Sequence, residues 1–232
     1  SLAVNPLAPD RVYAGTSRGV ARSSNGGLTW STAISASATS AGLAPAIAVG
    51  SVRSLVIDPV GATNLYAGTA QGVFKSSDAG LNWWLISASL IGDPSPFKLA
   101  IDPVDPAIIY GGGNAGVYVS TNGATNWSTV NSGLGNLSVR ALAIPPSPPA
   151  MLYAATAGGV YRSQNRGGNW LAANTGLTNL SVQAIAIDPV TPATVYAGTA
   201  GGVFKSVNAA TNWAAVNAGL SVTNVTALAI DP

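Results

Sequence analysis

The octapeptide SSDAGLNW at residues 76–83 decides the fold, because its pattern of Ser, then Asn or Asp two positions later, then Trp recurs along the chain. The other copies are SSNGGLTW (23–30), STNGATNW (120–127), SQNRGGNW (163–170) and SVNAATNW (206–213). In such a segment the Ser hydroxyl and the Asx side chain can hydrogen-bond backbone groups of a tight turn, while Gly tolerates a positive φ and Trp packs beneath. We therefore predict five stapled turns built on the following residues: Ser23, Asn25, Trp30, Ser76, Asp78, Trp83, Ser120, Asn122, Trp127, Ser163, Asn165, Trp170, Ser206, Asn208 and Trp213.

Asp78 is the only carboxylate among the five Asx positions. A charge-assisted hydrogen bond is about twice as strong as a neutral one. We expect the turn at Asp78 to be slightly the tightest.

The spacing of these turns indicates a repeated unit of about 43 residues. The five Trp residues are 53, 44, 43 and 43 positions apart, and tyrosines at 13, 66, 110, 153 and 196 keep identical spacings. This is the length of one four-stranded propeller blade. The sequence predicts an all-β propeller of five four-stranded antiparallel blades, at about residues 1–50, 51–95, 96–138, 139–181 and 182–224.

Each unit contains recognisable strands outside the turn. An inner strand such as VRSLVIDP (52–59) is followed by YAGT, by GVFKS and by a short strand after Trp. Residues 225–232, VTALAIDP, are a sixth copy of the inner strand. Either the chain is an excerpt of a larger propeller of six or more blades, or it is a single propeller domain, 1–232, in which the sixth copy displaces the first or pairs with another molecule.

The repeated turn resembles the Asp-box, or BNR, repeat family, and the resemblance covers essentially the whole chain. Members include sialidases, xyloglucan-cleaving glycosidases, the sortilin luminal domain and the photosystem II assembly and stability factor, all of them propellers. The resemblance implies a propeller fold without selecting one member. A sialidase site, with its Glu-activated Tyr, would need a Glu that this chain lacks.

Composition excludes several kinds of chemistry. The chain has no His, no Cys and no Glu, and its eight acidic residues are all Asp, so we expect no metal site and no cofactor. Its net charge is only +2 with the basic residues placed singly, which argues against nucleic acid. No apolar run reaches the length of a membrane span. A low charged fraction of 8% favours an extracellular, cell-surface or periplasmic setting.

The carboxylates do not form an evident catalytic pair. Asp58, Asp102, Asp188 and Asp231 share one slot of the repeat, which indicates a turn role, and Asp10 and Asp105 lie in the connection that follows it. Only Asp93 is out of register, whereas a glycosidase needs two flanking carboxylates. We therefore predict no catalytic residues and no enzymatic activity.

Departures from the repeat are the candidate binding residues. The irregular connections 31–51 and 87–97 belong to the loop edge opposite the stapled turns, near the start of the inner strands. There one slot holds Arg53, Phe97, Arg140, Gln183 and Thr226, with Arg18 in a nearby turn. We hypothesise a mildly cationic channel mouth that binds a carboxylate or a partner loop; the alternative is a solvated rim. Trp84, without an equivalent elsewhere, could stack on a sugar or a partner, or pack under a neighbouring loop.

Basic residues also recur just before the repeated Ser. Arg22, Lys75, Arg162 and Lys205 occupy this slot in four blades. We interpret it as structural, with the stem packed and the charge reaching solvent.

Three functional hypotheses follow. The first is a secreted or surface scaffold that binds a protein partner through the edge opposite the stapled turns. The alternatives are a fragment of a glycan-active or glycan-binding propeller, and a surface-layer or filament subunit that self-associates through the spare end strand.

Overall fold

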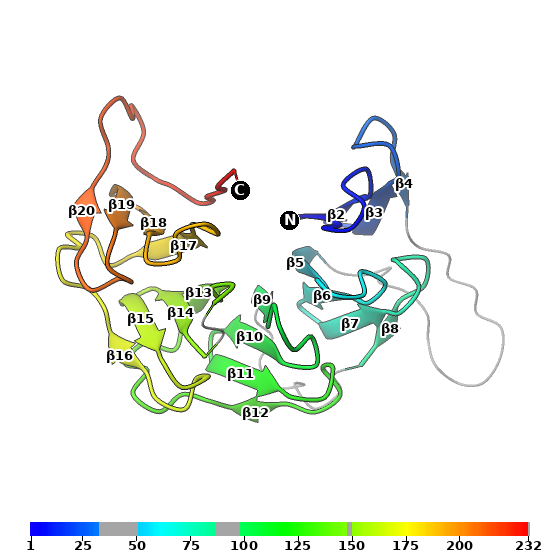
Figure 1. The fold of residues 1–232 in the computed structure, drawn as a ribbon, viewed down its shortest axis with the longest axis horizontal. Coiled ribbons are helices and arrows are strands. Elements are labelled where there is room, and N and C mark those ends of the chain that lie inside the picture. The colour runs from blue at the N-terminus through cyan, green and yellow to red at the C-terminus, as the bar shows by residue number, and fades with distance from the viewer. Residues whose placement is uncertain (33–50, 87–97, 148–149, 232) are drawn as a thin grey trace. The chain divides into compact units, whose positions relative to one another are not determined.

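The computed structural model describes residues 1–32, 51–86, 98–147 and 150–231 (Figure 1). These residues contain no helix and form five four-stranded antiparallel sheets. In each sheet the strands pair in chain order, from a first strand at one edge to a two-residue fourth strand at the other. The predicted fold class, an all-β propeller of five four-stranded blades, is confirmed.

The strands of the first two blades are β1 (Leu2–Val4), β2 (Val12–Thr16), β3 (Gly19–Ser23), β4 (Ser31–Thr32), β5 (Val52–Ile57), β6 (Leu65–Thr69), β7 (Gly72–Ser76) and β8 (Trp84–Leu85). The third blade contains β9 (Lys98–Ile101), β10 (Ile109–Gly113), β11 (Gly116–Ser120) and β12 (Ser128–Thr129). The last two contain β13 (Val139–Ala143), β14 (Leu152–Thr156), β15 (Gly159–Ser163), β16 (Leu171–Ala172), β17 (Val182–Ile187), β18 (Val195–Thr199), β19 (Gly202–Ser206) and β20 (Ala214–Ala215).

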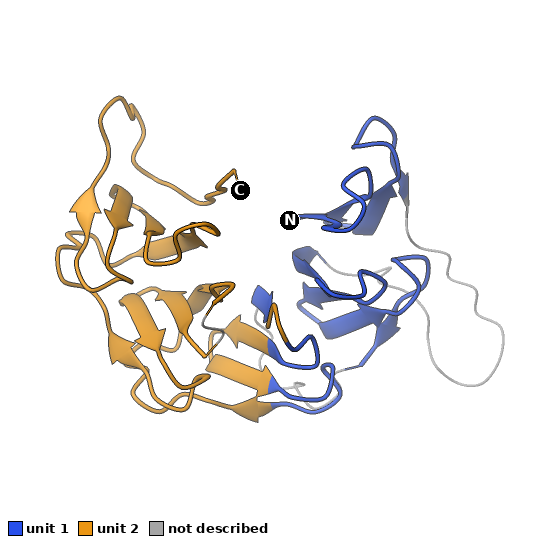
Figure 2. Ribbon diagram, viewed as in Figure 1, with its two compact units in different colours: residues 1–101, 105–109, 120–127 blue, residues 102–104, 110–119, 128–232 orange. Residues whose placement is uncertain are grey.

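The chain divides into two compact units (Figure 2). Unit 1 comprises residues 1–101, 105–109 and 120–127, and unit 2 comprises residues 102–104, 110–119 and 128–232. Each unit has its own buried cluster. One gathers around Tyr13, Leu65 and Phe74, and the other around Tyr153, Val195 and Phe204.

Second strands form the most buried layer of the blades. Every residue of β6, β10 and β14 is buried, which suits a strand covered on both faces and explains their small YAGT-type sequences. Gly112 in β10 illustrates the need for small residues. A Cβ there would collide with Val139 at the start of the next inner strand.

Third strands begin at a glycine that no other residue could replace easily. Gly159 has a φ of 115°, and a Cβ on it would fall against the Asn174 side chain. Asn174 Oδ1 accepts the Val160 N–H at 2.7 Å, and Asn131 and Asn217 do the same for Val117 and Val203. The Asn of each N-x-G-L loop thus fixes the start of the third strand in its own blade.

The inner strands β5, β13 and β17 each carry a β-bulge near their start. The register shifts fall between Val52 and Ser54, between Val139 and Ala141, and between Val182 and Ala184. A bulge inserts one residue that has no ladder partner and turns its side chain out of the regular alternation. The inserted residues are Arg53, Arg140 and Gln183.

The sixth copy of the inner-strand sequence does not form a strand among the described residues, which corrects the expectation of an extra strand there. The Val225 N–H donates to Thr199 O at 2.9 Å, and a Cβ on Gly198 would meet Val225, as one on Gly112 would meet Val139. Residues 225–231 therefore begin in the position of a next inner strand. Among the residues that the structure describes, no strand pairs with this segment in a ladder.

Candidate binding site

The stapled turns occupy one edge of each blade. In the second blade the Ser76 hydroxyl donates to Asp78 Oδ1 at 2.8 Å and accepts the Gly80 N–H at 2.9 Å. Asp78 Oδ1 accepts the Asn82 N–H at 2.8 Å, and its Oδ2 accepts the Asn82 side-chain amide at 2.7 Å. Burial alone would raise the pKa of Asp78, but these hydrogen bonds outweigh it and lower the pKa below its ordinary value.

The other four turns repeat this geometry with Asn. Their Ser-to-Asx bonds measure 2.9–3.0 Å, against 2.8 Å at Asp78. The hydrogen bond from Ser76 to Asp78 is thus the shortest of the five by about 0.1 Å, in the direction expected for a charged acceptor. The turns differ in where Trp points: Trp83 donates within its own turn, whereas Trp170 and Trp213 donate to Val130 and Ala173 of the preceding blade.

The aspartates of the repeated I-D-P slot close turns at the same edge. Asp58 Oδ1 accepts the N–H groups of Val60 and Gly61, at 2.9 and 3.1 Å. Asp188 binds the two equivalent N–H groups, and Asn5 does so in the first blade. The pKa of Asp58 is lowered, because the hydrogen bonds it accepts outweigh the effect of burial. These side chains are therefore occupied by turn formation.

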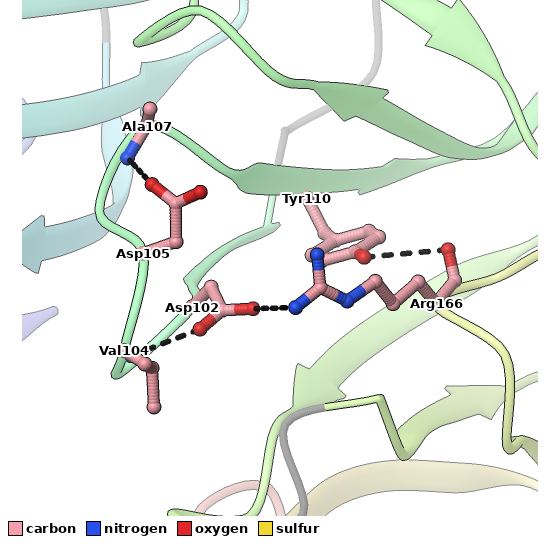
Figure 3. A network of polar contacts seen from close by, with 6 residues as sticks. All are labelled: Asp102, Val104, Asp105, Ala107, Tyr110 and Arg166. Atoms are coloured by element: carbon pink, nitrogen blue, oxygen red, sulfur yellow. Dashed lines mark hydrogen bonds and ion pairs between the residues drawn. The ribbon is translucent and has the colours of Figure 1, made fainter.

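Asp102 performs the same turn role and also faces a neighbouring blade (Figure 3). Its Oδ1 accepts the Val104 N–H at 2.9 Å, and its Oδ2 lies 4.0 Å from a guanidinium nitrogen of Arg166. The Tyr110 hydroxyl donates to Arg166 O at 3.3 Å, and burial raises the pKa of Tyr110 to about 12. This network joins the third blade to the stapled turn of the fourth and is structural.

Three of the four repeated basic residues contact a tyrosine ring or the backbone. The Lys75 ammonium lies 5.4 Å from the centre of the Tyr66 ring, and Lys205 lies at the same distance from Tyr196. Arg162 donates to Ala209 O in the next blade at 2.6 Å. These contacts fit the structural role expected for this slot.

At the opposite edge, the bulges present the inner-strand residues that we predicted as binding residues. In unit 2, Arg140 is half-buried and donates to the Ser181 hydroxyl at 2.8 Å, while Gln183 donates to Asn224 Oδ1 at 2.6 Å. Each of these two side chains thus hydrogen-bonds the residue that directly precedes the next inner-strand sequence. In unit 1, Arg53 is exposed.

Lys98, which the sequence reasoning missed, lies on the strand next to that of Arg53. β5 and β9 are neighbours in unit 1, and the Leu99 N–H donates to the Ser54 hydroxyl at 3.0 Å. Lys98 is half-buried; burial lowers the pKa of its ammonium, and the charge of Arg53 lowers it further. Counted back from the end of the inner strand, its slot holds Ser54, Ala141 and Ala184 in other blades. A lysine in a slot that otherwise holds small residues is visible in the sequence and could have identified Lys98 as a candidate.

The remaining predicted binding residues are dispersed. Arg18 is exposed in the β2–β3 turn, and its N–H donates to the Thr16 hydroxyl at 3.0 Å. Trp84 is 46% exposed on the outer strand β8. Phe97 and Asp93 lie outside the described residues. The hypothesis that all these slots line one channel mouth stays a prediction.

An apolar cavity of about 290 Å³ lies at the stapled-turn edge of unit 2. Its lining residues are Pro145, Ser147, Met151, Pro192, Ala193 and Ala209. Pro145 replaces the aspartate of the I-D-P slot. The cavity has almost no polar group to orient a ligand.

Metal-binding geometry does not arise in the described part of the chain. No three Asp side chains within residues 1–32, 51–86, 98–147 and 150–231 come together in a way that could hold an ion. The same residues include no helix long and apolar enough to cross a membrane.

Comparisons with solved structures bear on the fold. The chain is similar to an ancestral GH74 enzyme, with 21% identity and a TM-score of 0.75 over 97% of this chain and 32% of that one. It is also similar to the extracellular domain of a one-component system from B. thetaiotaomicron (17%, 0.65, over 88% and 26%) and to YCF48 from Cyanidioschyzon merolae (16%, 0.59, over 93% and 70%). No protein-family model matches the chain, and no curated protein matches its sequence.

The GH74 likeness corrects the prediction that this chain is not an enzyme. That prediction relied on the carboxylates within these 232 residues, whereas the chain spans about a third of the length of the first GH74 enzyme that it resembles. The acidic residues of such a segment do not show whether the whole protein is an enzyme. At these identities the likenesses establish the fold: the chain is a β-propeller of five four-stranded blades.

Proposed function

We propose that this chain is an interaction module of an extracellular or surface-located protein, and that it binds a peptide segment of a protein partner at the inner-strand edge opposite the stapled turns. The observation that carries the proposal is the set of bulges in β5, β13 and β17. In unit 1 the bulge places Arg53 at this edge of its own blade, and in unit 2 the bulges place Arg140 and Gln183 at this edge of theirs. Bulges are frequent next to binding and active sites because they redirect a side chain.

The opposite edge is less suited to binding. Asp58, Asp78, Asp102 and Asp188 accept backbone N–H groups there, and Arg162 donates to a backbone carbonyl. Such side chains cannot turn to a ligand without leaving backbone groups unpaired. The similarity to an extracellular domain supports the proposed location.

Selection from a random displayed-peptide library tests this proposal on the full chain. We expect enrichment of specific sequences by the wild type, and a loss of at least tenfold in their affinity with Arg53→Ala in unit 1. Arg11→Ala is the single-charge control, because Arg11 is exposed in the β1–β2 connection at the stapled-turn edge. Failure to enrich any sequence, or retention of affinity in Arg53→Ala, would contradict the proposal.

A second candidate is a glycan-active or glycan-binding propeller, favoured by the TM-score of 0.75 to a GH74 enzyme. Incubation of the chain with xyloglucan, followed by reducing-end and affinity-electrophoresis assays, tests it. Asp93→Asn is the informative variant, because Asp93 is out of register with every repeat. Hydrolysis that disappears in this variant would favour the glycan-active candidate over the peptide-binding one.

A further inference from the structure

We propose that Arg53 and Lys98 form a carboxylate-binding site in unit 1 that takes an acidic side chain or the C-terminal carboxylate of a bound peptide. The inference rests on the proposed function and specifies its ligand. It assigns a role to Lys98, a residue that the repeat itself does not require.

The backbone places the two residues on neighbouring strands. The bulge at Arg53 removes its side chain from the ladder alternation, and the next residue, Ser54, accepts the Leu99 N–H at 3.0 Å. That bond joins β5 to β9 beside Lys98. Both side chains therefore come from paired, ordered strands and not from a loop, which favours a preorganised site.

The arrangement costs stability, which a purely structural role does not explain. Lys98 is half-buried beside a second positive charge. Among the described residues neither Arg53 nor Lys98 forms an ion pair, and the single salt bridge there involves Arg166 and Asp102. The other blades use Ser or Ala in the slot of Lys98. A carboxylate would relieve the repulsion by pairing with both groups.

The chemistry of the pair favours a carboxylate over other ligands. A carboxylate offers two acceptor oxygens, which match a guanidinium fork and an ammonium donor at once. Extended nucleic-acid phosphates would require more basic residues than a chain of net charge +2 with isolated cations supplies. Sugar rings pack on exposed aromatic faces. In the described inner strands no aromatic residue occurs.

Binding of two short peptides by the full chain tests the site. One carries two glutamates with both ends capped, and the other replaces them with glutamine and leaves the C-terminal carboxylate free. A third peptide, with glutamine and both ends capped, is the negative control. We expect at least one carboxylate peptide to bind at least tenfold more tightly than the control, with this advantage lost in Lys98→Gln.

A second readout distinguishes a binding role from a structural one. NMR titration of the Lys98 side chain should show its pKa rising when the carboxylate peptide binds, because a nearby negative charge favours the ammonium form. Lys98→Arg should retain most of the binding, and Arg11→Gln should change it less than twofold. Thermal unfolding of each variant verifies that it is folded.

Several results would overturn the carboxylate assignment. Equal affinity for all three peptides, an equal effect of Lys98→Gln and Arg11→Gln, or binding that appears only after Asp93→Asn would each do so. The last result would mean that Arg53 and Lys98 pair with an acidic residue of the chain itself. If the library yields neutral peptides whose binding still depends on Arg53, the proposed peptide binding stands and the carboxylate site alone fails.

Discussion

At the scale of single residues, Lys98 and Asp78 show opposite relations between charge and folding. The Asp78 carboxylate is surrounded by donors, and its charged form is favoured in the folded chain. The ammonium of Lys98 has a second cation nearby, and its charged form is disfavoured. The charge of Asp78 stabilises the fold, whereas the charge of Lys98 destabilises it. A destabilising charge fits the binding role that we propose for Lys98.

Replacing Lys98 should therefore stabilise the chain while removing ligand binding. For Lys98→Met we expect the free energy of unfolding at neutral pH to rise by about 0.5–1 kcal/mol, as is typical when a functional compromise is removed. The wild type should gain stability only when the pH rises through the lowered pKa of Lys98, because the ammonium then loses its proton in the folded chain before it does so in the unfolded chain. Urea unfolding of both chains at neutral and alkaline pH measures this. A variant less stable than wild type at neutral pH would contradict the expectation.

Asp78 should contribute stability that acid removes. Its folded pKa lies below the ordinary value of 3.8, so the contribution is complete above that value and is lost as pH falls through the folded pKa. Asp78→Asn keeps one acceptor oxygen but has no proton to take up. We expect the wild type to lose more stability than this variant between about pH 5 and pH 2. Parallel pH profiles of the unfolding midpoint would show that Asp78 has no such role.

At the scale of elements, each blade is stabilised by short-range polar contacts around its turns. The Asn of the N-x-G-L loop fixes the third strand, the Ser and Asx residues fix the stapled turn, and tyrosines bond to the adjacent blade. The fourth blade differs, because the Tyr153 hydroxyl donates to the Met151 sulfur at 2.9 Å and Arg162 binds the next turn instead. The blades are thus similar but not interchangeable.

Removing one loop asparagine should be costly. Asn174→Ala leaves the buried Val160 N–H without its acceptor, and we expect a loss of about 1–3 kcal/mol in the free energy of unfolding. Asn212→Ala is the matched control, because its exposed side chain forms no hydrogen bond within the described part of the chain, and it should change stability by less than about 0.5 kcal/mol. Chemical denaturation of both variants measures the difference. Equal effects would mean that the loop bond is not worth more than a surface contact.

Much of this level was predictable from the residues. The Trp and Tyr periods give the blades, and the Ser-Asx pattern gives the turns, because these contacts are local in sequence. The bulges were not predictable, since Arg53, Arg140 and Gln183 follow a buried Val in sequences that fit a regular strand equally well. Lys98 was missed because its significance depends on β5 and β9 being neighbours, which is a long-range contact.

At the scale of the whole molecule, the chain combines two units, each with its own buried cluster. Residues 225–231 begin like an inner strand and have no ladder partner among the described residues. An inner-strand sequence with free backbone donors and acceptors is a site for pairing with another chain. We therefore keep self-association through this segment as a prediction.

A proline in this segment should reduce any self-association. Ala227→Pro removes a backbone donor that a ladder would need, whereas Ala227→Val keeps it and favours a strand. With light scattering after size-exclusion chromatography, we expect the wild type and the Val variant to show mass that rises with concentration. The Pro variant should remain monomeric. A wild type that is monomeric at all concentrations would rule out this mode of association.

The bulges also have an evolutionary consequence. An inserted residue without a ladder partner is free of the packing demands that fix Val52, Val139 and Val182 beside it. Substitutions at these positions can therefore change the inner-strand edge while the core packing of each strand stays the same. Each bulge therefore provides one position at which selection can change a surface side chain without changing the architecture of the blade.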